Sequence, residues 1–208
     1  MNLYLSSYKL GNKKDILIDW NKNHKKVLII PNASDIYPDN DIKLKDINEC
    51  INELIEIGYI CEILNLKNWF NKEKKLNNFL KNYDSFYVLG GNTFTLRQAM
   101  KLSGFDKYLK NNIHNPNIMY IGYSAGICVL ASDLHGIEYA DSIEKDPYNY
   151  GSIEWEGVGI IDFMPIPHYN SENNILSLKM NAVEKSLKDK GERYITLSDG
   201  EAIYLKNN

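Results

Sequence analysis

The sequence predicts an α/β fold in which a mainly parallel sheet carries helices on both faces. Short apolar runs typical of strands alternate with amphipathic stretches of helical periodicity along most of the 208 residues. One of these runs, residues 27–30, contains no polar residue, as in a strand that is covered on both faces. Because no repeat or linker interrupts the pattern, residues 1–208 are expected to form a single domain.

The first part of the chain begins with two short predicted strands, residues 2–8 and 15–20, separated by a turn. The apolar run at residues 27–30 predicts a third strand, which ends at a proline. A helix is predicted at residues 41–58, because its apolar residues recur every three or four positions and a glycine ends it.

The same alternation continues to residue 123. Further strands are predicted at residues 59–64, 85–91 and 118–123. Further helices are predicted at residues 72–83, 93–102 and 105–113. Strands separated by helices in this way are typical of a parallel sheet.

Past residue 131 the pattern is looser. Residues 132–162 are rich in Gly, Asp, Glu and Tyr and are expected to form long loops with one short hairpin. An apolar strand at residues 163–168 and a helix at residues 172–191 follow. Residues 193–206 are expected to form two short strands around a turn at residues 198–200.

Composition is that of an ordinary globular protein and argues against some partners. Hydrophobic residues make up 44% and charged residues 25% of the sequence, and the formal net charge is -3. A basic face for nucleic acid is therefore not expected. The N-terminus lacks the pattern of a secretory signal, and no apolar run approaches the ~20 residues that span a bilayer. We therefore expect a cytoplasmic protein that does not bind membranes.

The three cysteines are not expected to carry chemistry. Cys50, Cys61 and Cys128 are an odd number and lack the paired spacing of a metal site. We expect them to be buried, reduced thiols. Nothing in the sequence implies a metal ion or an organic cofactor.

The stretch GYSAG places Ser124 between Gly122 and Gly126, after a predicted strand and before a predicted helix at residues 125–132. A nucleophile elbow has this pattern, because the backbone of its serine is strained and larger neighbours would clash. A helix that starts directly after the serine would also favour an oxyanion nearby. A structural strand-to-helix turn with an incidental serine has the same pattern, so the pentapeptide alone leaves both interpretations open.

A second glycine turn lies in YVLGGNTFTL, about one strand–helix unit before Ser124. If the two strands are neighbours, both turns lie at the same sheet edge, where open α/β sheets bind ligands. The N–H groups of Gly91 and Ala125 would then be placed to bind an oxyanion. Asn92 and Thr93 are expected either to contact the substrate or to cap the following helix.

Among the four histidines, His168 is the best candidate for the base that Ser124 would need. It follows a proline at the end of an apolar strand, where a side chain can reach the sheet edge. His24 and His114 lie in polar turns, and His135 lies in a loop past the glycine-flanked serine.

A carboxylate is expected to orient the imidazole, but spacing does not single one out. Asp199 and Glu201 lie downstream of His168. The other acidic candidates lie in the loops between the serine and the histidine, at Asp133, Glu138, Asp141, Glu154, Glu156 and Asp162.

The motifs LGGNTFTL, YIGYSAG and MPIPHY, in this order, resemble the peptidase E and cyanophycinase family of serine peptidases. The fold of that family is similar to that of class I glutamine amidotransferases. The resemblance runs from the first strand to LSDGEAIYL, which is nearly the whole chain. It implies Ser124 as nucleophile, His168 as general base, and Gly91 with Ala125 as the oxyanion hole.

The resemblance also suggests an acid. A Glu-Gly turn near the end of peptidase E is similar to the Asp-Gly turn here, which favours Asp199. Another aspartate, shortly after the elbow helix, has also been considered in that family, and Glu138 and Asp141 lie approximately in its register. Asp141, Glu138 and Glu201 therefore stay open as alternatives.

Specificity for an N-terminal aspartate, which some peptidase E-like enzymes have, requires a cation for its side chain. Arg97 and Arg193 are the only arginines, and neither lies in a recognisable specificity motif. Arg97 is expected on the solvated face of its helix. Residues 141–156 are acidic and aromatic, and they are expected either to form a surface loop or to line a pocket for a basic or amino-terminal group.

Three other functions share parts of the pattern. An α/β-hydrolase esterase has its histidine last in the triad and typically an HGGG motif, whereas here His168 is the last histidine and HGGG is absent. A glutamine amidotransferase would have cysteine where Ser124 stands, and Cys128 is better explained as core. A binding module on the same fold would keep the glycines without needing Ser124 and His168 together.

The sequence therefore predicts a serine peptidase that hydrolyses dipeptides or other short peptides through an acyl-enzyme. Its expected partner is a short peptide substrate, with no nucleic acid, membrane or cofactor, and a homodimer is left open as its assembly. An inactive small-molecule or peptide binding module on the same fold is the alternative.

Overall fold

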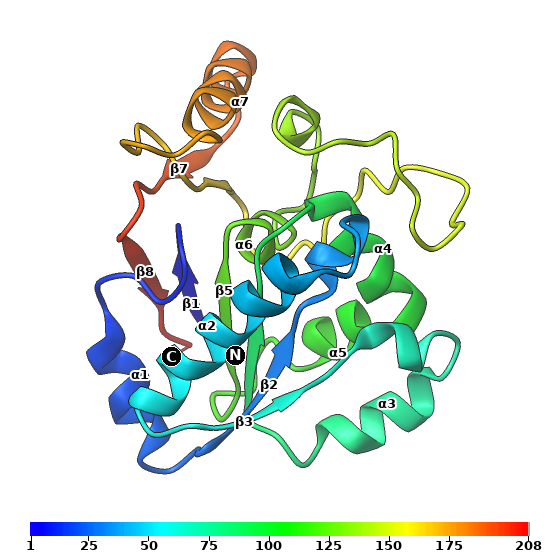
Figure 1. Ribbon diagram of the computed structural model, residues 1–208, viewed down its shortest axis with the longest axis vertical. Coiled ribbons are helices and arrows are strands. Elements are labelled where there is room, and N and C mark those ends of the chain that lie inside the picture. The colour runs from blue at the N-terminus through cyan, green and yellow to red at the C-terminus, as the bar shows by residue number, and fades with distance from the viewer. Residues whose placement is uncertain (208) are drawn as a thin grey trace.

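The alternating pattern of the sequence folds into a six-stranded sheet with the strand order β3-β2-β4-β5-β1-β8 (Figure 1). This structure is a computed structural model that describes residues 1–207. The strands of this central sheet are β1 (Asn2–Ser6), β2 (Lys26–Ile30), β3 (Ile60–Ile63), β4 (Ser85–Val88), β5 (Met119–Tyr123) and β8 (Ala202–Leu205). Every pairing except that of β1 with β8 is parallel. The predicted α/β fold with a mainly parallel sheet is confirmed.

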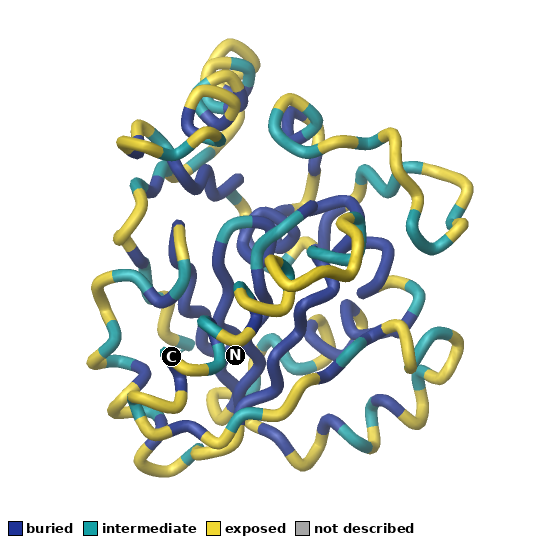
Figure 2. Tube along the Cα trace, viewed as in Figure 1, coloured by how far each residue is buried: buried dark blue, intermediate teal, exposed yellow. Residues whose placement is uncertain are grey.

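Helices cover both faces of the central sheet. Helices α1 (Lys14–Asn21) and α2 (Asp41–Glu56) pack on one face, and α3 (Glu73–Leu80), α4 (Thr93–Ser103) and α5 (Phe105–Asn111) pack on the other. Strand β2 shows why the sequence requires this arrangement. Val27 and Ile29 face one helix layer, Leu28 and Ile30 face the other, and all four are fully buried. Figure 2 shows the central strands as a buried interior bordered by helices with exposed outer sides.

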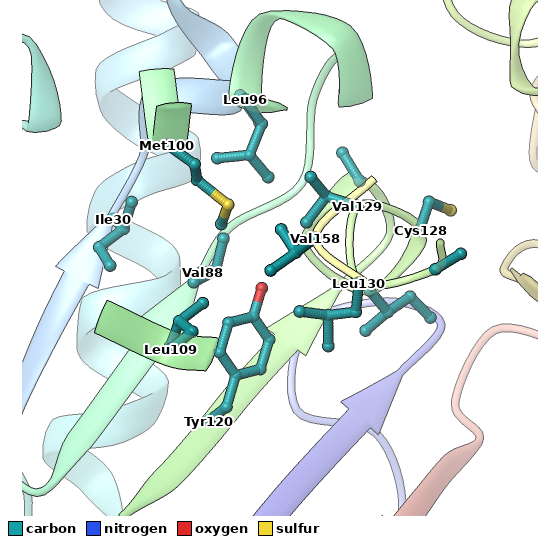
Figure 3. Close-up of a cluster of buried hydrophobic side chains, with 14 of the residues drawn as sticks. Ile30, Val88, Leu96, Met100, Leu109, Tyr120, Cys128, Val129, Leu130 and Val158 are labelled. Atoms are coloured by element: carbon teal, nitrogen blue, oxygen red, sulfur yellow. The ribbon is translucent and has the colours of Figure 1, made fainter. Parts of the chain in front are cut away.

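One hydrophobic cluster fixes the segment that follows Ser124. Figure 3 shows Val129, Leu130 and Val158 packed with side chains of the sheet and of helices α4 and α5. These three side chains have no exposed surface. Since burying one such side chain contributes about 1.5–3 kcal/mol, the chain beyond Ser124 is firmly anchored.

A smaller unit lies outside the central sheet. We call it the outer unit, and it consists of β6 (Met164–Ile166), α7 (Ser177–Lys190) and β7 (Tyr194–Thr196). Strands β6 and β7 form a two-stranded parallel sheet of their own. Figure 1 shows α7 and β7 beyond the end of β1 and β8. Buried side chains of the outer unit, among them Ile166 and Val183, join the core that α3–α5 share with the sheet.

Residues 15–20 are helical, not a strand as predicted. Helix α1 buries Leu17 fully, while Ile18 is 38% exposed. A short apolar run fits a strand or one side of a short helix equally well, so periodicity alone does not decide between them. Here β1 pairs with β5 and β8, which leaves residues 15–20 to cover the sheet face.

Two further predictions past residue 123 need correction. The helix expected at residues 125–132 is shorter, because α6 covers only Ala125–Cys128. Within residues 132–162 an isolated antiparallel bridge joins Asp133 to Glu156 where a short hairpin was expected, and a 3-10 turn covers Ile137–Tyr139. The two strands predicted within residues 193–206 are present as β7 and β8, but they belong to different sheets.

Cys50, Cys61 and Cys128 are free thiols, and Cys50 and Cys128 are buried as expected. Cys61 is only partly buried, contrary to the expectation, because it lies on β3 at the edge of the sheet. Within residues 1–207 no group of three or more His, Cys, Asp and Glu side chains is placed to hold a metal ion. In the same part of the chain, every helix is too short or too polar to cross a membrane.

Candidate active site

The GYSAG stretch forms a sharp turn between β5 and α6. Ser124 has φ 51° and ψ −120°, a backbone conformation that residues other than glycine rarely adopt. Gly126 lies so close to β4 that a Cβ atom added to it would be 2.3 Å from the carbonyl oxygen of Val88. Close packing of two backbones therefore requires the glycine and holds the Ser124 side chain at the carboxyl end of β5, as a nucleophile elbow does.

The second glycine turn lies at the same sheet edge. Strands β4 and β5 are neighbours, with Val88 opposite Gly122. Gly91 has φ 143°, and an added Cβ would lie 2.4 Å from the carbonyl oxygen of Ala33. Among residues 1–207 no hydrogen bond occupies the N–H of Gly91 or of Ala125. The elbow thus has two backbone donors beside it, which is the requirement for an oxyanion hole.

Asn92 is the N-cap of α4, and Thr93 is the first residue of that helix. The Asn92 side chain accepts a hydrogen bond from the Thr95 N–H at 2.8 Å and donates to the carbonyl oxygen of Ser142 at 2.8 Å. Both Asn92 and Thr93 are buried, and neither lines the cavity beside Ser124. Of the two expectations, the geometry favours the helix cap for Asn92. Thr93 does not cap the helix, and its N–H donates to Asp141 Oδ2.

His168 links Ser124 to Asp199. Its Nε2 lies 3.0 Å from Ser124 Oγ, and its Nδ1 lies 2.6 Å from Asp199 Oδ1. The ionised carboxylate accepts a hydrogen bond from the Nδ1–H group, which leaves the lone pair of Nε2 free to accept the hydroxyl proton of Ser124. The ring is 4% exposed, so its orientation is fixed by the protein and not by solvent.

Two residues that the sequence analysis did not single out hold this pair in place. The Ser7 hydroxyl accepts the backbone N–H of His168 at 2.7 Å and donates to Asp199 Oδ1 at 2.8 Å. The Asn174 amide donates to Asp199 Oδ2 at 2.7 Å. Ser7 directly follows the strand next to β5, at the same sheet edge as Ser124, and this position is the signal that sequence reasoning had available.

These hydrogen bonds determine the charge of Asp199. Burial alone would raise the pKa of its carboxyl group. Hydrogen bonds from Asn174, His168 and Ser7 outweigh that effect and hold the pKa below its ordinary value. Asp199 is therefore ionised at neutral pH and stabilises a positive charge on the imidazole.

The other candidate acids have different partners. Asp141 is partly buried, and desolvation raises the pKa of its carboxyl group, while its Oδ2 accepts the Thr93 N–H at 2.7 Å. Glu138 accepts the Gly136 N–H and Glu201 accepts the Ser198 N–H. Asp199 is the candidate among them that is hydrogen bonded to His168.

The remaining histidines lie elsewhere. His24 pairs with Asp84 at 3.0 Å and stacks on Trp20, and His135 pairs with Asp133 at 2.6 Å. His114 is exposed, in agreement with its expected position in a polar turn. His135 lines a separate cavity of about 380 Å³ that shares no residue with the one beside Ser124.

Arg97 is buried, so the expectation that it lies on the solvated face of its helix is wrong. Its guanidinium Nη1 lies 2.9 Å from Asp106 Oδ2, and its Nε–H donates to the carbonyl oxygen of Glu156. The side chain is 3% exposed, because other segments cover almost all of α4. Arg193 is exposed and pairs with Asp162.

A cavity of about 590 Å³ opens beside Ser124 and His168. Its walls are largely apolar and include Tyr8, Tyr37 and Ile42. Residues 141–156, offered above as a pocket wall or a surface loop, do not line it. This volume and lining are typical of a site for a small ligand.

Known proteins resemble the chain in sequence. The model of peptidase family S51 matches residues 6–208. An uncharacterized peptidase of Pasteurella multocida is 27% identical over 159 residues, which cover 76% of this chain and 72% of that protein. An uncharacterized peptidase of Listeria monocytogenes is 31% identical over 127 residues, or 61% of this chain and 58% of that protein. The match to the Listeria protein thus spans less than two thirds of its length.

Solved structures resemble the chain in fold. A crystal structure described as a candidate peptidase E from Listeria monocytogenes EGD-e superposes with a TM-score of 0.76 and 26% sequence identity, covering 100% of this chain and 95% of that one. A peptidase from an acI-B1 Actinobacterium superposes with a TM-score of 0.69 at 17% identity, covering 99% of this chain and 83% of that one. The second similarity is evidence of the fold alone.

Proposed function

The chain belongs to peptidase family S51, and we propose that it hydrolyses short peptides through a triad of Ser124, His168 and Asp199. The observation that supports this proposal best is the continuous line of hydrogen bonds from Ser124 Oγ through the His168 ring to Asp199. The strained backbone of Ser124 gives independent support, since such strain is typical of functional sites.

In the acylation step, the Ser124 hydroxyl oxygen attacks the carbonyl carbon of the scissile peptide bond. His168 Nε2 takes the hydroxyl proton as the new C–O bond forms. The N–H groups of Gly91 and Ala125 donate to the oxygen that becomes negatively charged. Asp199 keeps the imidazole in the required tautomer and stabilises its positive charge.

Collapse of the tetrahedral intermediate breaks the C–N bond. His168 donates its proton to the leaving amine, and the acyl group stays on Ser124 as an ester. A water molecule then attacks this ester, His168 accepts the water proton, and the Ser124 hydroxyl is restored as the acid leaves. The residues required for this cycle all belong to the described chain.

The size of the cavity supports a short substrate. About 590 Å³ lies within the range of small-ligand sites and suits a dipeptide or a slightly longer peptide. Residues of α2 line one part of the cavity, and residues 174–176 line another.

The test is covalent labelling of Ser124 with a fluorophosphonate probe, followed by hydrolysis of a panel of dipeptides. We expect the label on Ser124, and we expect Ser124→Ala to remove it and to lower kcat/KM by roughly 10⁶-fold. The melting temperature should barely change. Ser132→Ala, at an exposed serine, is the matched control and should keep both labelling and turnover.

A well-folded protein that takes no label and hydrolyses no dipeptide would contradict the proposal. That result would favour a binding module on the same fold, in which Ser124 contacts a ligand without attacking it.

A further inference from the structure

The cavity beside Ser124 contains a carboxylate without a cationic partner, that of Asp46. This residue lies on α2 and, with Lys43 of the same helix, supplies the charged groups among the lining residues apart from His168. Within residues 1–207 no lysine or arginine nitrogen lies within ion-pair distance of Asp46. An unpaired charge in a ligand cavity indicates a partner that arrives with the ligand.

The lysines around Asp46 are engaged by other carboxylates. Lys43 Nζ lies 2.9 Å from Asp39 and 3.3 Å from Asp35. Lys9 Nζ lies 2.6 Å from Glu49. Carboxylates already neutralise the ammonium groups of both lysines, which weakens their attraction for a negatively charged substrate group, whereas Asp46 has no such partner.

Partial burial makes the ionised form of Asp46 unfavourable in free energy when the cavity holds no ligand. Burial raises the pKa of its carboxyl group, and this effect exceeds the lowering by the nearby Lys9 and by the nearby Tyr123 hydroxyl. Glu49 adds further repulsion. A cation bound in the cavity would offset this cost, because a buried carboxylate is stabilised by an opposite charge.

Asp46 is also close to the reacting groups. Asp46 lines the same cavity as Tyr123, which is the residue directly before Ser124. Tyr8 lines this cavity too, and the centroid of its ring lies 6.0 Å from that of the Tyr123 ring and 6.3 Å from that of the His168 ring. A substrate held at Ser124 therefore extends into the surroundings of Asp46.

Neither arginine is available for an acidic substrate side chain. Arg97 is buried in its ion pair with Asp106, and Arg193 lines a different cavity. An aspartyl side chain in the cavity beside Ser124 would meet Asp46 instead.

We propose, building on the peptidase function above, that Asp46 selects peptides that place a positive charge in this cavity and disfavours peptides that place an aspartyl side chain there. The charge is an ammonium group. It comes either from the free N-terminus of the peptide or from a lysyl side chain, and the same carboxylate serves both. The apolar walls contact the uncharged part of the substrate.

Binding to the Ser124→Ala protein, measured by calorimetry, tests this specificity without any turnover. Four peptides separate the sources of charge: Leu-Leu amide, acetyl-Leu-Leu amide, acetyl-Lys-Leu amide and Asp-Leu amide. We expect a peptide with an ammonium group and no acidic side chain to bind at least about tenfold more tightly than acetyl-Leu-Leu amide. Preference for Leu-Leu amide identifies the N-terminus, and preference for acetyl-Lys-Leu amide identifies the side chain.

Asp46→Asn in the same background keeps the shape of the side chain and removes its charge. The preference for the ammonium group should disappear in this variant and in Asp46→Ser, which is the second variant if the amide disturbs folding. Glu56→Gln is the matched control, because Glu56 lies on the same helix, is exposed and does not line the cavity. It should keep the preference.

Three results would overturn the proposal. They are a preference that survives Asp46→Asn, tightest binding by Asp-Leu amide, and no binding by any of the four peptides. Labelling and turnover of the Ser124 protein report the peptidase function separately, so a protein that hydrolyses peptides without the Asp46-dependent preference would refute this inference alone.

Discussion

The two halves of the candidate site are built in different ways. Ser124 and Gly91 belong to turns of the central sheet, where backbone packs directly on backbone, against Val88 and Ala33. The turns that carry His168 and Asp199 follow β6 and β7, strands of three residues outside the central sheet. Side-chain hydrogen bonds, among them those from Ser7 and Asn174, hold this second half.

The catalytic groups are therefore positioned in two different ways. Close backbone contacts in a buried sheet place the nucleophile, so a change there should disturb folding. Hydrogen bonds between side chains place the base and the acid, so a change there should disturb proton transfer more than folding. Ser7 connects the two halves, because it directly follows β1 and bonds to both His168 and Asp199.

The largest effect in the second half is expected for Asp199→Asn. The amide keeps the size of the side chain but loses the charge that stabilises the imidazolium, and it no longer favours the tautomer in which Nδ1 is protonated. We expect kcat/KM to fall by about 10⁴-fold, the order known for such a change in a serine protease triad. The melting temperature should fall only modestly, by the stabilisation that the ionised carboxylate contributes, so the loss of activity far exceeds the loss of stability.

Two further carboxylates are controls for Asp199. Glu201→Gln, at an exposed position, should leave kcat/KM unchanged. Asp141→Asn tests the acid left open by the sequence. A larger loss of kcat/KM in Asp141→Asn than in Asp199→Asn would reassign the third member of the triad.

The contrast between the halves also explains what the sequence could predict of the fold. The strand at β2 and the helix at α2 depend on local periodicity, and both are found where predicted. Residues 15–20 were predicted wrongly, since a short apolar run becomes a helix or a strand according to its tertiary contacts. The positions of strands β7 and β8 were predicted, but the local sequence does not show that β7 pairs with β6 and β8 with β1.

The site follows the same rule. Ser124 and Gly91 lie in short motifs whose glycines are required by local geometry, so the sequence predicts their place at one sheet edge. Asp199 could not be separated from Asp141 by spacing, because only the fold decides which carboxylate reaches His168. Ser7 lies 161 residues from His168 in the chain, and no local sequence pattern predicts the hydrogen bond between them.

In the first half, Gly126→Ala should destabilise the protein. The added Cβ would lie 2.3 Å from the Val88 carbonyl oxygen, so α6 and β4 must separate. We expect a loss of about 3 kcal/mol in the free energy of unfolding by urea. Gly191→Ala in the outer unit is the comparison, because nothing lies within 4 Å of an added Cβ there and only its φ of 71° is unfavourable. That loss should be about 1 kcal/mol, and equal losses would remove the contrast.

Of the three main variants, Ser7→Ala is expected to have the smallest effect. Ser7 is the residue that connects the two halves of the site. The variant leaves the buried His168 N–H without its acceptor, at a cost of about 2 kcal/mol. It also removes a donor that lowers the pKa of Asp199. We expect a lower kcat, because the imidazole is less firmly oriented, together with a lower melting temperature.

The pH dependence of that melting temperature shows how much of the loss of stability is due to the charge of Asp199. A carboxyl group whose pKa is lowered on folding stabilises the native state above its unfolded pKa, about 3.9, and this contribution is lost as the pH falls through the lower folded pKa. The difference in melting temperature between Ser7→Ala and the parent protein should therefore be larger at pH 7 than at the acid end of this range. Ser103→Ala, at a buried serine that bonds to the Ala99 carbonyl oxygen, should show the same loss at both pH values. A pH-independent loss in Ser7→Ala would mean that Ser7 supports only the backbone of His168 and does not help to keep Asp199 ionised.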